Sequence, residues 1–533
     1  MTIARTVAEV LNDHVTLEIE GIDRMYLNLY VPILQSPRGV GHFWINHRGH
    51  RFASSALMAP MTEAFVRSID RFAEAEGIPV VSFKKGQRKD DVAKEYLAKF
   101  PHQEGVLFIG KAQEKTRVVR TAKRRNPNTG VVYPWLVMST AMVNHYYFYC
   151  VDRDFGPFFL KLGSYFPYTG KVALNGHEYL KRQLKQEGIA FEALDNGLLS
   201  CADPARAQVI CDELTPEVIN DFIRKWLRRL PHPFTPEDRS AGYLYDISIL
   251  QAEFALTQVF DRPVQGRVFF EQVIRDNLDL GRPDRAQLVF ERRITKKTPG
   301  RFRTRVITQG VIPNLYIDYK HTRIKQYYKE GRALRTETTI NDTRDFEIGK
   351  RLKNLPALRE VGFQANRRLL DVQRISHDSF LGEEVFRGIH EPVTVNGRRA
   401  AALRFGNPRV LALLSCLVLF HLLPRGFTNR DLRERIAPIY GQKLNSGQMS
   451  YDLRRLRLHG LIEKIPKTRR YRVTHMGFRA ALFISRCYAR LLRPGLADLA
   501  PDCQPPASVP LRRAFENIDR VIEQGWEAQQ LAA

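Results

Sequence analysis

The sequence lacks the cysteine patterns that mark zinc-binding or disulfide-rich proteins. Its 533 residues include six cysteines, none in a CxxC pair, and no Cys/His cluster has zinc spacing. Long apolar runs are also missing. The most apolar run, residues 410–423, is too short for a membrane span of about 20 residues, and the N-terminal residues contain no apolar signal segment. We therefore expect reduced thiols, a cytoplasmic protein and no membrane partner.

Acidic residues are in the minority. The chain has 83 Lys and Arg against 57 Asp and Glu, which gives a formal net charge of +26. Such an excess attracts polyanions, and nucleic acid is the commonest of them. With 44% hydrophobic and 10% aromatic residues, the composition is that of a folded protein. The length predicts roughly three or four domains. The expected fold class is α+β and multidomain.

Shifts in residue pattern divide the chain into six predicted regions. These are an N-terminal α/β domain (1–130), a central α/β core (131–275), a basic β-rich nucleic-acid-binding region (276–345), a helical linker (346–404), a C-terminal module (405–493), and a Pro-rich loop with a final helix (494–533).

The β-rich region concentrates positive charge. Between Arg292 and Arg335 there are 13 Lys and Arg against two acids. Arg301, Arg303 and Arg305 alternate, so on a strand they would share one face, which cannot be a core face. Such a face is either solvated or bound to an anion, and it fits DNA or RNA. A smaller cluster at 123–125 lies beside a strand end, where phosphate contact and an ordinary solvated loop both fit the pattern.

The C-terminal module reads as helix, helix, helix, strand, basic tip, strand. Its segment YDLRRLRLHGLIEKIPKTRRYRVT resembles the third helix and wing of the winged helix-turn-helix family. The resemblance implies a third helix in the DNA major groove and a wing on the backbone. A winged helix used for protein contacts is the alternative. The residues expected to face DNA are Gln448, Tyr451, Arg454 and Arg455 on the helix and Lys467, Arg469 and Arg470 on the wing.

The central region presents the turn sequence Asp195-Asn196-Gly197 after an apolar run. Asn-Gly is a strong turn signal, so an ordinary turn is one interpretation. The other rests on the predicted order β, β, β, α, β and the phrase GIAFEALDNG, which resemble the RNase H-like core of DDE-type transposases and integrases. In that fold the first and fourth strands lie side by side, which would bring Asp152 and Asp195 together.

A third acid is expected on a later helix predicted within residues 243–260. Glu253 is preferred there because an unpaired carboxylate is costly in an apolar stretch. The resemblance implies that Asp152, Asp195 and Glu253 form a catalytic, metal-binding set. Carboxylates so close repel one another unless a divalent cation neutralises them. The expected ion is Mg²⁺, with Mn²⁺ as a substitute, acting on a phosphodiester.

Two weaker constellations stay open. Glu104, Lys111 and Glu114 have the acid-plus-lysine arrangement of restriction-like nucleases. Residues 319–341 resemble strands of replication initiators, in which Tyr327 or Tyr328 would attack DNA. The whole chain is also similar to a widespread set of bacterial proteins, a resemblance that implies a bacterial, cytoplasmic protein and no particular activity.

The sequence therefore predicts a DNA-binding protein with two alternative roles. The first is a Mg²⁺-dependent endonuclease or transposase-like protein of a mobile element or defence system. The second is a non-catalytic winged-helix regulator, or the targeting subunit of a larger nucleoprotein complex.

Overall fold

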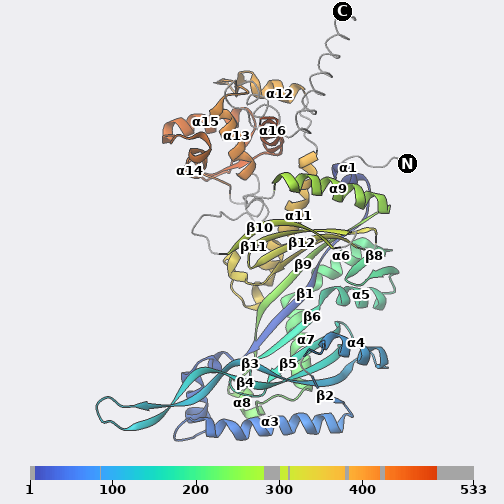
Figure 1. Cartoon of the computed structure of the whole chain (residues 1–533), viewed down its shortest axis with the longest axis vertical. Helices are drawn as coiled ribbons and strands as arrows, with labels where there is room; N and C mark the ends of the chain where they lie inside the picture. Colours follow the sequence, from blue (N-terminus) through green and yellow to red (C-terminus); the bar gives the residue numbers. More distant parts are fainter. Residues whose placement is uncertain are drawn as a thin grey trace, which may run out of the picture. The chain divides into compact units, whose positions relative to one another are not determined.

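A computed structural model describes residues 7–83, 86–280, 300–309, 312–329, 331–377, 383–420 and 426–488. The loop and helix predicted for 494–533 lie outside these residues. The chain forms two compact units, one of residues 1–286 with 295–371 and one of 287–294 with 372–533. The fold is α+β, as predicted (Figure 1). Among the described helices, none is long and apolar enough to cross a membrane.

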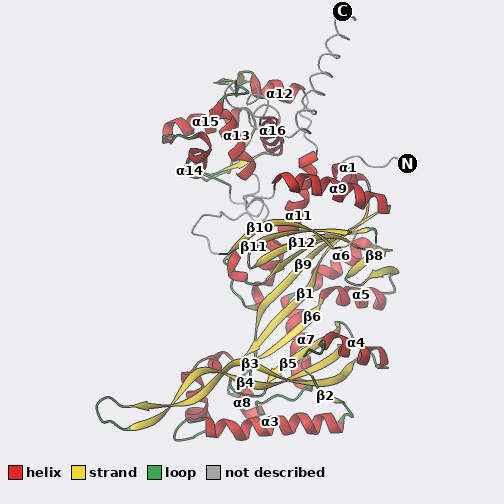
Figure 2. Ribbon diagram, viewed as in Figure 1, coloured by secondary structure: helices red, strands yellow, loops and turns green. Residues whose placement is uncertain are grey.

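The first unit is built on one mixed sheet of eleven strands (Figure 2). Only β2 and β3 pair in parallel; the other neighbours are antiparallel. The order across the sheet is β10-β11-β12-β13-β9-β1-β6-β5-β4-β3-β2. Its strands are β1 (Val15–Tyr30), β2 (Val80–Ser82), β3 (Gly105–Arg125), β4 (Val132–Asp152), β5 (Gly156–Gly163), β6 (Gly170–Asn175), β9 (Asp246–Phe260), β10 (Arg301–Gln309), β11 (Ile312–Lys320), β12 (Thr322–Lys329) and β13 (Ala333–Ile340).

The sheet divides the chain differently from the predicted domains. β1 lies between β9 and β6, so the first strand of the chain pairs with strands that come much later. The predicted boundary at 130 falls in the turn of the β3–β4 hairpin, and β10 to β13 extend the same sheet as β9. The predicted linker 346–404 contains α11 (Leu355–His377), which belongs mostly to the first unit.

Helices cover both faces of the β9–β13 part of the sheet. α11 lies on one face, where Asn366 Nδ2 donates to the carbonyl of Phe254 at 2.9 Å. Strand residues alternate between faces, so the odd-numbered positions of β9 face the other way, toward a cavity that α5 and α6 help to line. The remaining helices of this unit are α1 (Val7–Asp13), α2 (Pro37–His42), α3 (Ser55–Ala75), α4 (Lys89–Lys99), α5 (Gly176–Gln186), α6 (Pro204–Glu213), α7 (Pro216–Arg229), α8 (Pro236–Ser240) and α9 (Pro263–Leu280).

The central region does not have the strand neighbours of an RNase H-like core. β4, β5, β6 and α5 follow in the predicted order, but β7 (Phe191–Leu194) pairs with β8 (Gly197–Cys201) in a separate two-stranded sheet. β4 lies between β5 and β3 instead of beside β7. The helix expected within residues 243–260 is also corrected, because these residues form β9, paired on both sides.

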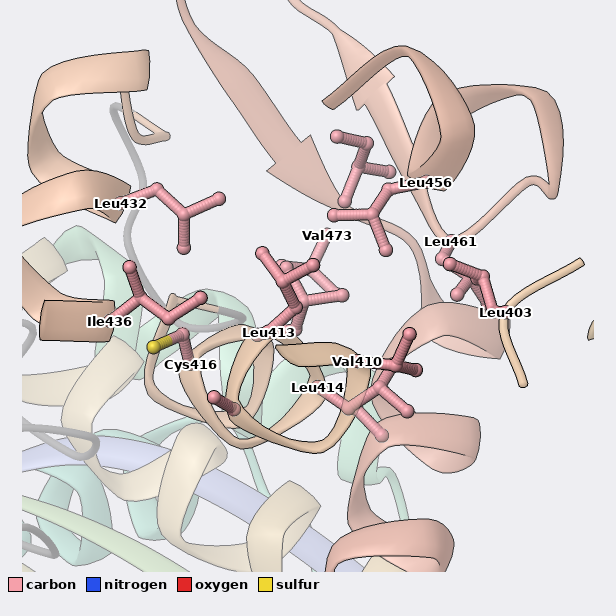
Figure 3. Close-up of a cluster of buried hydrophobic side chains, with 14 of the residues drawn as sticks. Leu403, Val410, Leu413, Leu414, Cys416, Leu432, Ile436, Leu456, Leu461 and Val473 are labelled. Carbon is pink, nitrogen blue, oxygen red and sulfur yellow. The ribbon is translucent and has the colours of Figure 1, made fainter. Parts of the chain in front are cut away.

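The second unit has the element order expected for the C-terminal module. α13, α14 and α15 precede the β16–β17 hairpin and α16 follows it, around a core that includes Leu413, Ile436 and Leu456 (Figure 3). A second small hairpin, β14–β15, precedes these helices. The elements are α12 (Glu383–His390), β14 (Val393–Val395), β15 (Arg398–Ala400), α13 (Pro408–Phe420), α14 (Asn429–Tyr440), α15 (Ser446–Leu458), β16 (Ile462–Lys464), β17 (Tyr471–Val473) and α16 (His475–Cys487).

Candidate functional site

Three carboxyl groups meet inside the first unit, each from a different strand. Asp23 lies in β1, Glu253 in β9 and Glu337 in β13, and these strands are neighbours in the sheet. One oxygen of each lies within 4.8 Å of the others. The β1 register shifts between Ile22 and Arg24, which places Asp23 at a β-bulge; bulges commonly re-aim a side chain. We call Asp23, Glu253 and Glu337 the acid cluster.

A buried arginine holds two of these acids. Arg335 Nη2 donates to Asp23 Oδ2 at 2.7 Å and to Glu337 Oε1 at 3.0 Å, and its Nη1 donates to Thr257 Oγ1 at 2.5 Å. On the other side His177 Nδ1 bonds Asp23 Oδ1 at 2.9 Å. Burial opposes ionisation of Asp23, but Arg335 and His177 hold the pKa of its carboxyl well below the usual value. Asp23 is therefore a carboxylate at neutral pH.

Glu253 is in the opposite electrostatic state. Burial, followed by the negative charges of Asp23 and Glu337, raises the pKa of Glu253 to about 8. At neutral pH it is therefore mostly a neutral carboxylic acid beside two other acids. Groups with such shifts are often found at functional sites.

The acid cluster could hold a metal ion, because three carboxyl oxygens converge there. Oxygen ligands of this kind suit hard divalent cations. Asp23 and Glu337 are nevertheless already neutralised in part by Arg335. An ion bound here would therefore compete with the guanidinium for the same carboxylates.

The edge of the acid cluster is formed by a tyrosine, an amide and two lysines. Tyr327 Oη donates to Glu337 Oε1 at 2.7 Å, and Asn196 Nδ2 donates to the same oxygen at 3.1 Å. Lys329 Nζ donates to Asn196 Oδ1 at 2.6 Å, and Lys325 Nζ lies 4.0 Å from the centre of the Tyr327 ring. Alternate residues of β12 thus carry positive charge beside the acids.

The space beside the acid cluster is small. A cavity of about 30 Å³ is lined in part by Asp23, His177 and Thr257, which is room for about one water molecule. Gly197 borders it with a φ of +156°, and a Cβ at this position would lie 3.0 Å from Arg335 Nη1. This close approach explains why a glycine follows Asn196.

The structure brings one of the three predicted catalytic acids into this cluster. Glu253 is there, but on a strand instead of a helix. Asp195 points outward, with 90% of its side chain exposed and Lys329 Nζ at 3.3 Å from Oδ2. Its neighbour Asn196 is the turn residue that reaches the cluster. The sequence analysis did not identify Asp23 or Glu337. A signal for Glu337 was present, because Arg335 and Glu337 are two residues apart and therefore share one face of a strand.

Asp152 has a different environment at the end of β4. It accepts hydrogen bonds from Lys225 Nζ and Trp226 Nε1, both at 2.8 Å, and from the backbone N–H groups of Asp154 and Phe155. Burial opposes its ionisation, but these donors lower the pKa of Asp152. The carboxylate therefore joins α7 to the β4–β5 turn, and the predicted set of Asp152, Asp195 and Glu253 is not assembled.

The residues of the two weaker candidate sites do not come together either. Glu104 pairs with Lys225 and Arg229, whereas Glu114 pairs with Lys89 and Lys161. Of the two tyrosines considered as nucleophiles, Tyr327 contacts the acid cluster. Tyr328 packs against Phe260 and Phe270 instead.

The strand expected at the alternating arginines is confirmed as β10. Its backbone pairs Arg303 with Asp318 and Arg305 with Tyr316 of β11. Arg301 is exposed; the side chains of Arg303 and Arg305 lie outside the described part of the structure.

On α15 the structure separates the predicted DNA-facing residues into two groups. Gln448, Tyr451 and Arg454 are exposed, with Tyr451 51% exposed. Arg455 is instead used inside the unit, where its Nη2 donates to the carbonyl of Ala402 at 2.5 Å and its side chain is 12% exposed. The prediction that Arg455 faces outward is therefore corrected.

The tip of the β16–β17 hairpin is largely open to solvent. Lys467 and Arg469 are exposed, and Lys467 has a φ of +58°. Arg470 is half-buried and its Nη2 donates to the carbonyl of Gly426 at 3.1 Å. No acidic residue lies between Lys464 and Arg470.

No family model, curated protein or solved structure matches this chain.

Proposed function

We propose that this protein binds duplex DNA through α15 and the β16–β17 hairpin, in the manner of a winged helix-turn-helix. The observation that carries the proposal is the polarity of α15. Met449, Leu453 and Leu456 are buried on its inner side, whereas Gln448 and Arg454 are exposed on its outer side. The major groove of duplex DNA is wide enough to admit an α-helix, so the exposed side of α15 can contact the base edges there.

The side chains on this surface have the chemistry of DNA recognition. Arginine donates two hydrogen bonds to a guanine edge, whereas glutamine donates one to adenine N7 and accepts one from its N6 amino group. The hairpin adds Lys467 and Arg469, whose charges suit the phosphate backbone. Gln448 Oε1 also accepts from the backbone N–H of Asn445 at 3.0 Å, so Arg454 is the stronger candidate for base contact.

The test compares single-charge variants of the full chain. Duplexes enriched from a random pool by the wild-type protein serve as probes, and affinity is measured by fluorescence anisotropy. Arg454→Ala should weaken binding by about 1–3 kcal/mol, the value of a good base contact. Lys94→Ala removes an exposed charge from α4 and should change affinity less than twofold. Equal affinities of the two variants would refute the assignment of α15.

A second candidate function is Mg²⁺-dependent cleavage of a phosphodiester at the acid cluster. The observation that favours it is the juxtaposition of Glu253, two carboxylates and Tyr327 beside positive side chains of β12. The reaction joins a water oxygen to phosphorus and breaks the bond to a sugar oxygen, which takes up the proton that the water loses. Mn²⁺ is the expected substitute ion.

DNA binding is the better supported of the two functions, because its residues are exposed whereas Asp23 and Glu337 are buried. Incubation with supercoiled plasmid and Mg²⁺ or Mn²⁺ tests the second. Nicks that disappear in Glu337→Gln but persist in Asp195→Asn would support it, and the absence of nicking in the wild type would exclude it.

A further inference from the structure

The outer part of the β3–β4 hairpin carries positive charge only. We call residues 115–142 the arm; Figure 1 shows it running out past the helices of its unit. It contains six Lys and Arg and no Asp or Glu. All six basic residues are exposed: Lys115, Arg117, Arg120, Lys123, Arg124 and Arg125. A surface of this length with one sign of charge is complementary to a polyanion.

The arm is firmly attached at its base. The backbone N–H of Val119 donates to the carbonyl of Phe166 at 3.2 Å, and the hydroxyl of Thr121 accepts from the backbone N–H of Ser55 at 2.7 Å. Val118 and Leu136 are buried there. Beyond this base, the strands are covered by neither α3 nor the sheet. From Thr121 to Arg125, the part of β3 beyond this base extends about 13 Å, at about 3.3 Å per residue.

The tip of the arm is an ordered turn with an exposed proline. Asn126 Oδ1 accepts from the backbone N–H of Asn128 at 2.9 Å, and Arg125 Nε donates to the carbonyl of Gly130 at 3.1 Å. Gly130 has a φ of +68°. Pro127, the first residue of this turn, is exposed, and so is Val131 after it. The tip therefore presents apolar atoms next to the cationic strand β3.

The aromatic residues of the arm are already partnered. Trp135 is 49% exposed, but the Arg124 guanidinium lies 5.2 Å from the centre of its ring, and Tyr133 meets it edge-on at 6.3 Å. Arg124 therefore competes with an unpaired base for this aromatic face. Binding to a duplex does not require stacking on an aromatic ring. Arginine side chains contact the phosphates and the groove edges, and apolar side chains can insert between neighbouring base pairs.

We propose that the arm lies in the minor groove of duplex DNA, with its arginines and lysines along the groove and Pro127 inserted as a wedge that bends the duplex. Proline and other apolar side chains act in this way in proteins that bend DNA from the minor groove. This inference rests on the proposed function, since it assumes a DNA partner. It adds a second contact surface to the one on α15, and this surface recognises shape and flexibility of DNA.

The first test measures charge. Lys123→Ala/Arg124→Ala/Arg125→Ala in the full chain should reduce affinity for a non-specific duplex of about 30 base pairs at least tenfold at about 0.1 M salt. The slope of log affinity against log salt should fall by about 2–3, since each phosphate contact contributes about 0.9. The matched control Arg71→Ala/Lys94→Ala/Lys99→Ala loses three exposed charges from α3 and α4. It should change both values little, and equal effects of the two triple variants would overturn the proposal.

The second test measures bending. With fluorophores at the two ends of the duplex, the wild type should increase energy transfer. Pro127→Ala should keep affinity within threefold and lose at least half of this increase. No increase with the wild type would overturn the proposal, as would arm-dependent binding that is stronger to single strands or to vesicles of anionic lipid than to the duplex. Unchanged circular dichroism of each variant confirms that it is folded.

The outcomes separate the arm from α15. If Arg454→Ala weakens binding and the arm variants do not, the arm proposal fails and the proposed function stands. If the wild type binds no duplex, both fail.

Discussion

Asp195 and Asn196 stand next to each other in one turn and have opposite environments. The aspartate is exposed, whereas the side chain of Asn196 is buried and donates to Tyr327 Oη at 3.0 Å as well as to Glu337. A turn sequence alone does not distinguish the two. The difference arises because the β7–β8 turn meets β12 and β13, which lie more than 120 residues later.

Replacing Asn196 should therefore cost much more stability than replacing Asp195. Asn196→Ala removes its hydrogen bonds to the buried Glu337, to Tyr327 and to Lys329, and we expect a loss of about 1–3 kcal/mol in the free energy of unfolding. Asp195→Ala, the matched control, should change it by less than about 0.5 kcal/mol. Urea denaturation measures both, and similar losses for the two variants would contradict the contacts described.

Glu253 makes stability depend on pH. Its pKa is raised to about 8 in the folded state, so the folded protein binds a proton that the unfolded chain has already released above pH 4.5. The stabilisation is complete below that pH and is lost as pH rises toward 8. Arg24 and Arg335 favour the charged form of the cluster, but burial, Asp23 and Glu337 outweigh them at Glu253.

We expect the free energy of unfolding of the wild type to fall by roughly 2 kcal/mol between pH 6.5 and 8.5. Glu253→Gln removes the titration and should flatten this dependence. His232, whose pKa is lowered to about 4, changes stability in the opposite direction only below about pH 6.5, so it does not interfere. Denaturation at several pH values measures the effect, and equal slopes for wild type and variant would show that Glu253 is already ionised.

Close packing between α11 and the sheet depends on a glycine. A Cβ at Gly362 would lie 2.3 Å from Cδ2 of Phe254 in β9, so an added methyl must push the helix away from the strand. Gly362→Ala should lower the free energy of unfolding by about 1–3 kcal/mol. Gly41 in α2 has no atom within 4 Å of the corresponding position, and Gly41→Ala should stabilise by up to about 1 kcal/mol.

Thermal unfolding of these two variants gives the comparison. A loss in Gly41→Ala as large as in Gly362→Ala would mean that helix geometry, and not the contact with Phe254, controls the result.

Elements with local signals were predictable. The helices of the second unit have recognisable caps: Thr428 begins α14 with a capping box, and Gly441 ends it with a φ of +78°. The apolar run within residues 243–260 fits both a helix and a strand buried on both faces, so its pattern alone wrongly predicts a helix. Pairing with β1 and β13, which the local sequence does not encode, decides for the strand.

The acid cluster could be predicted only in part for the same reason. The sequence points to Glu253 because a lone carboxylate in an apolar run needs a partner. Its partners Asp23 and Glu337 lie 230 residues before it and 84 residues after it in the chain. They become neighbours only when β1 and β13 flank β9.

Local unfolding of the first unit should begin at the β2 edge of its sheet. β1 is paired along most of its length on one side and over six residues on the other, whereas β2 is a three-residue edge strand with exposed positions. Amide hydrogens in the middle of β1 and β9 should therefore exchange through global unfolding only, and those of β2 and α4 much earlier. Hydrogen exchange followed by mass spectrometry measures this order, and fast exchange in β1 would contradict the sheet order.

The central place of β1 also affects how the protein is made. A ribosome releases residues 15–30 well before their hydrogen-bonding partners, because β6 and β9 begin to emerge only after about 140 and 216 further residues have been translated. During that interval this strand of 16 residues has two unsatisfied edges, a state prone to aggregation. Production of this protein in another host is therefore expected to benefit from slow synthesis or from a chaperone that holds the emerging N-terminus.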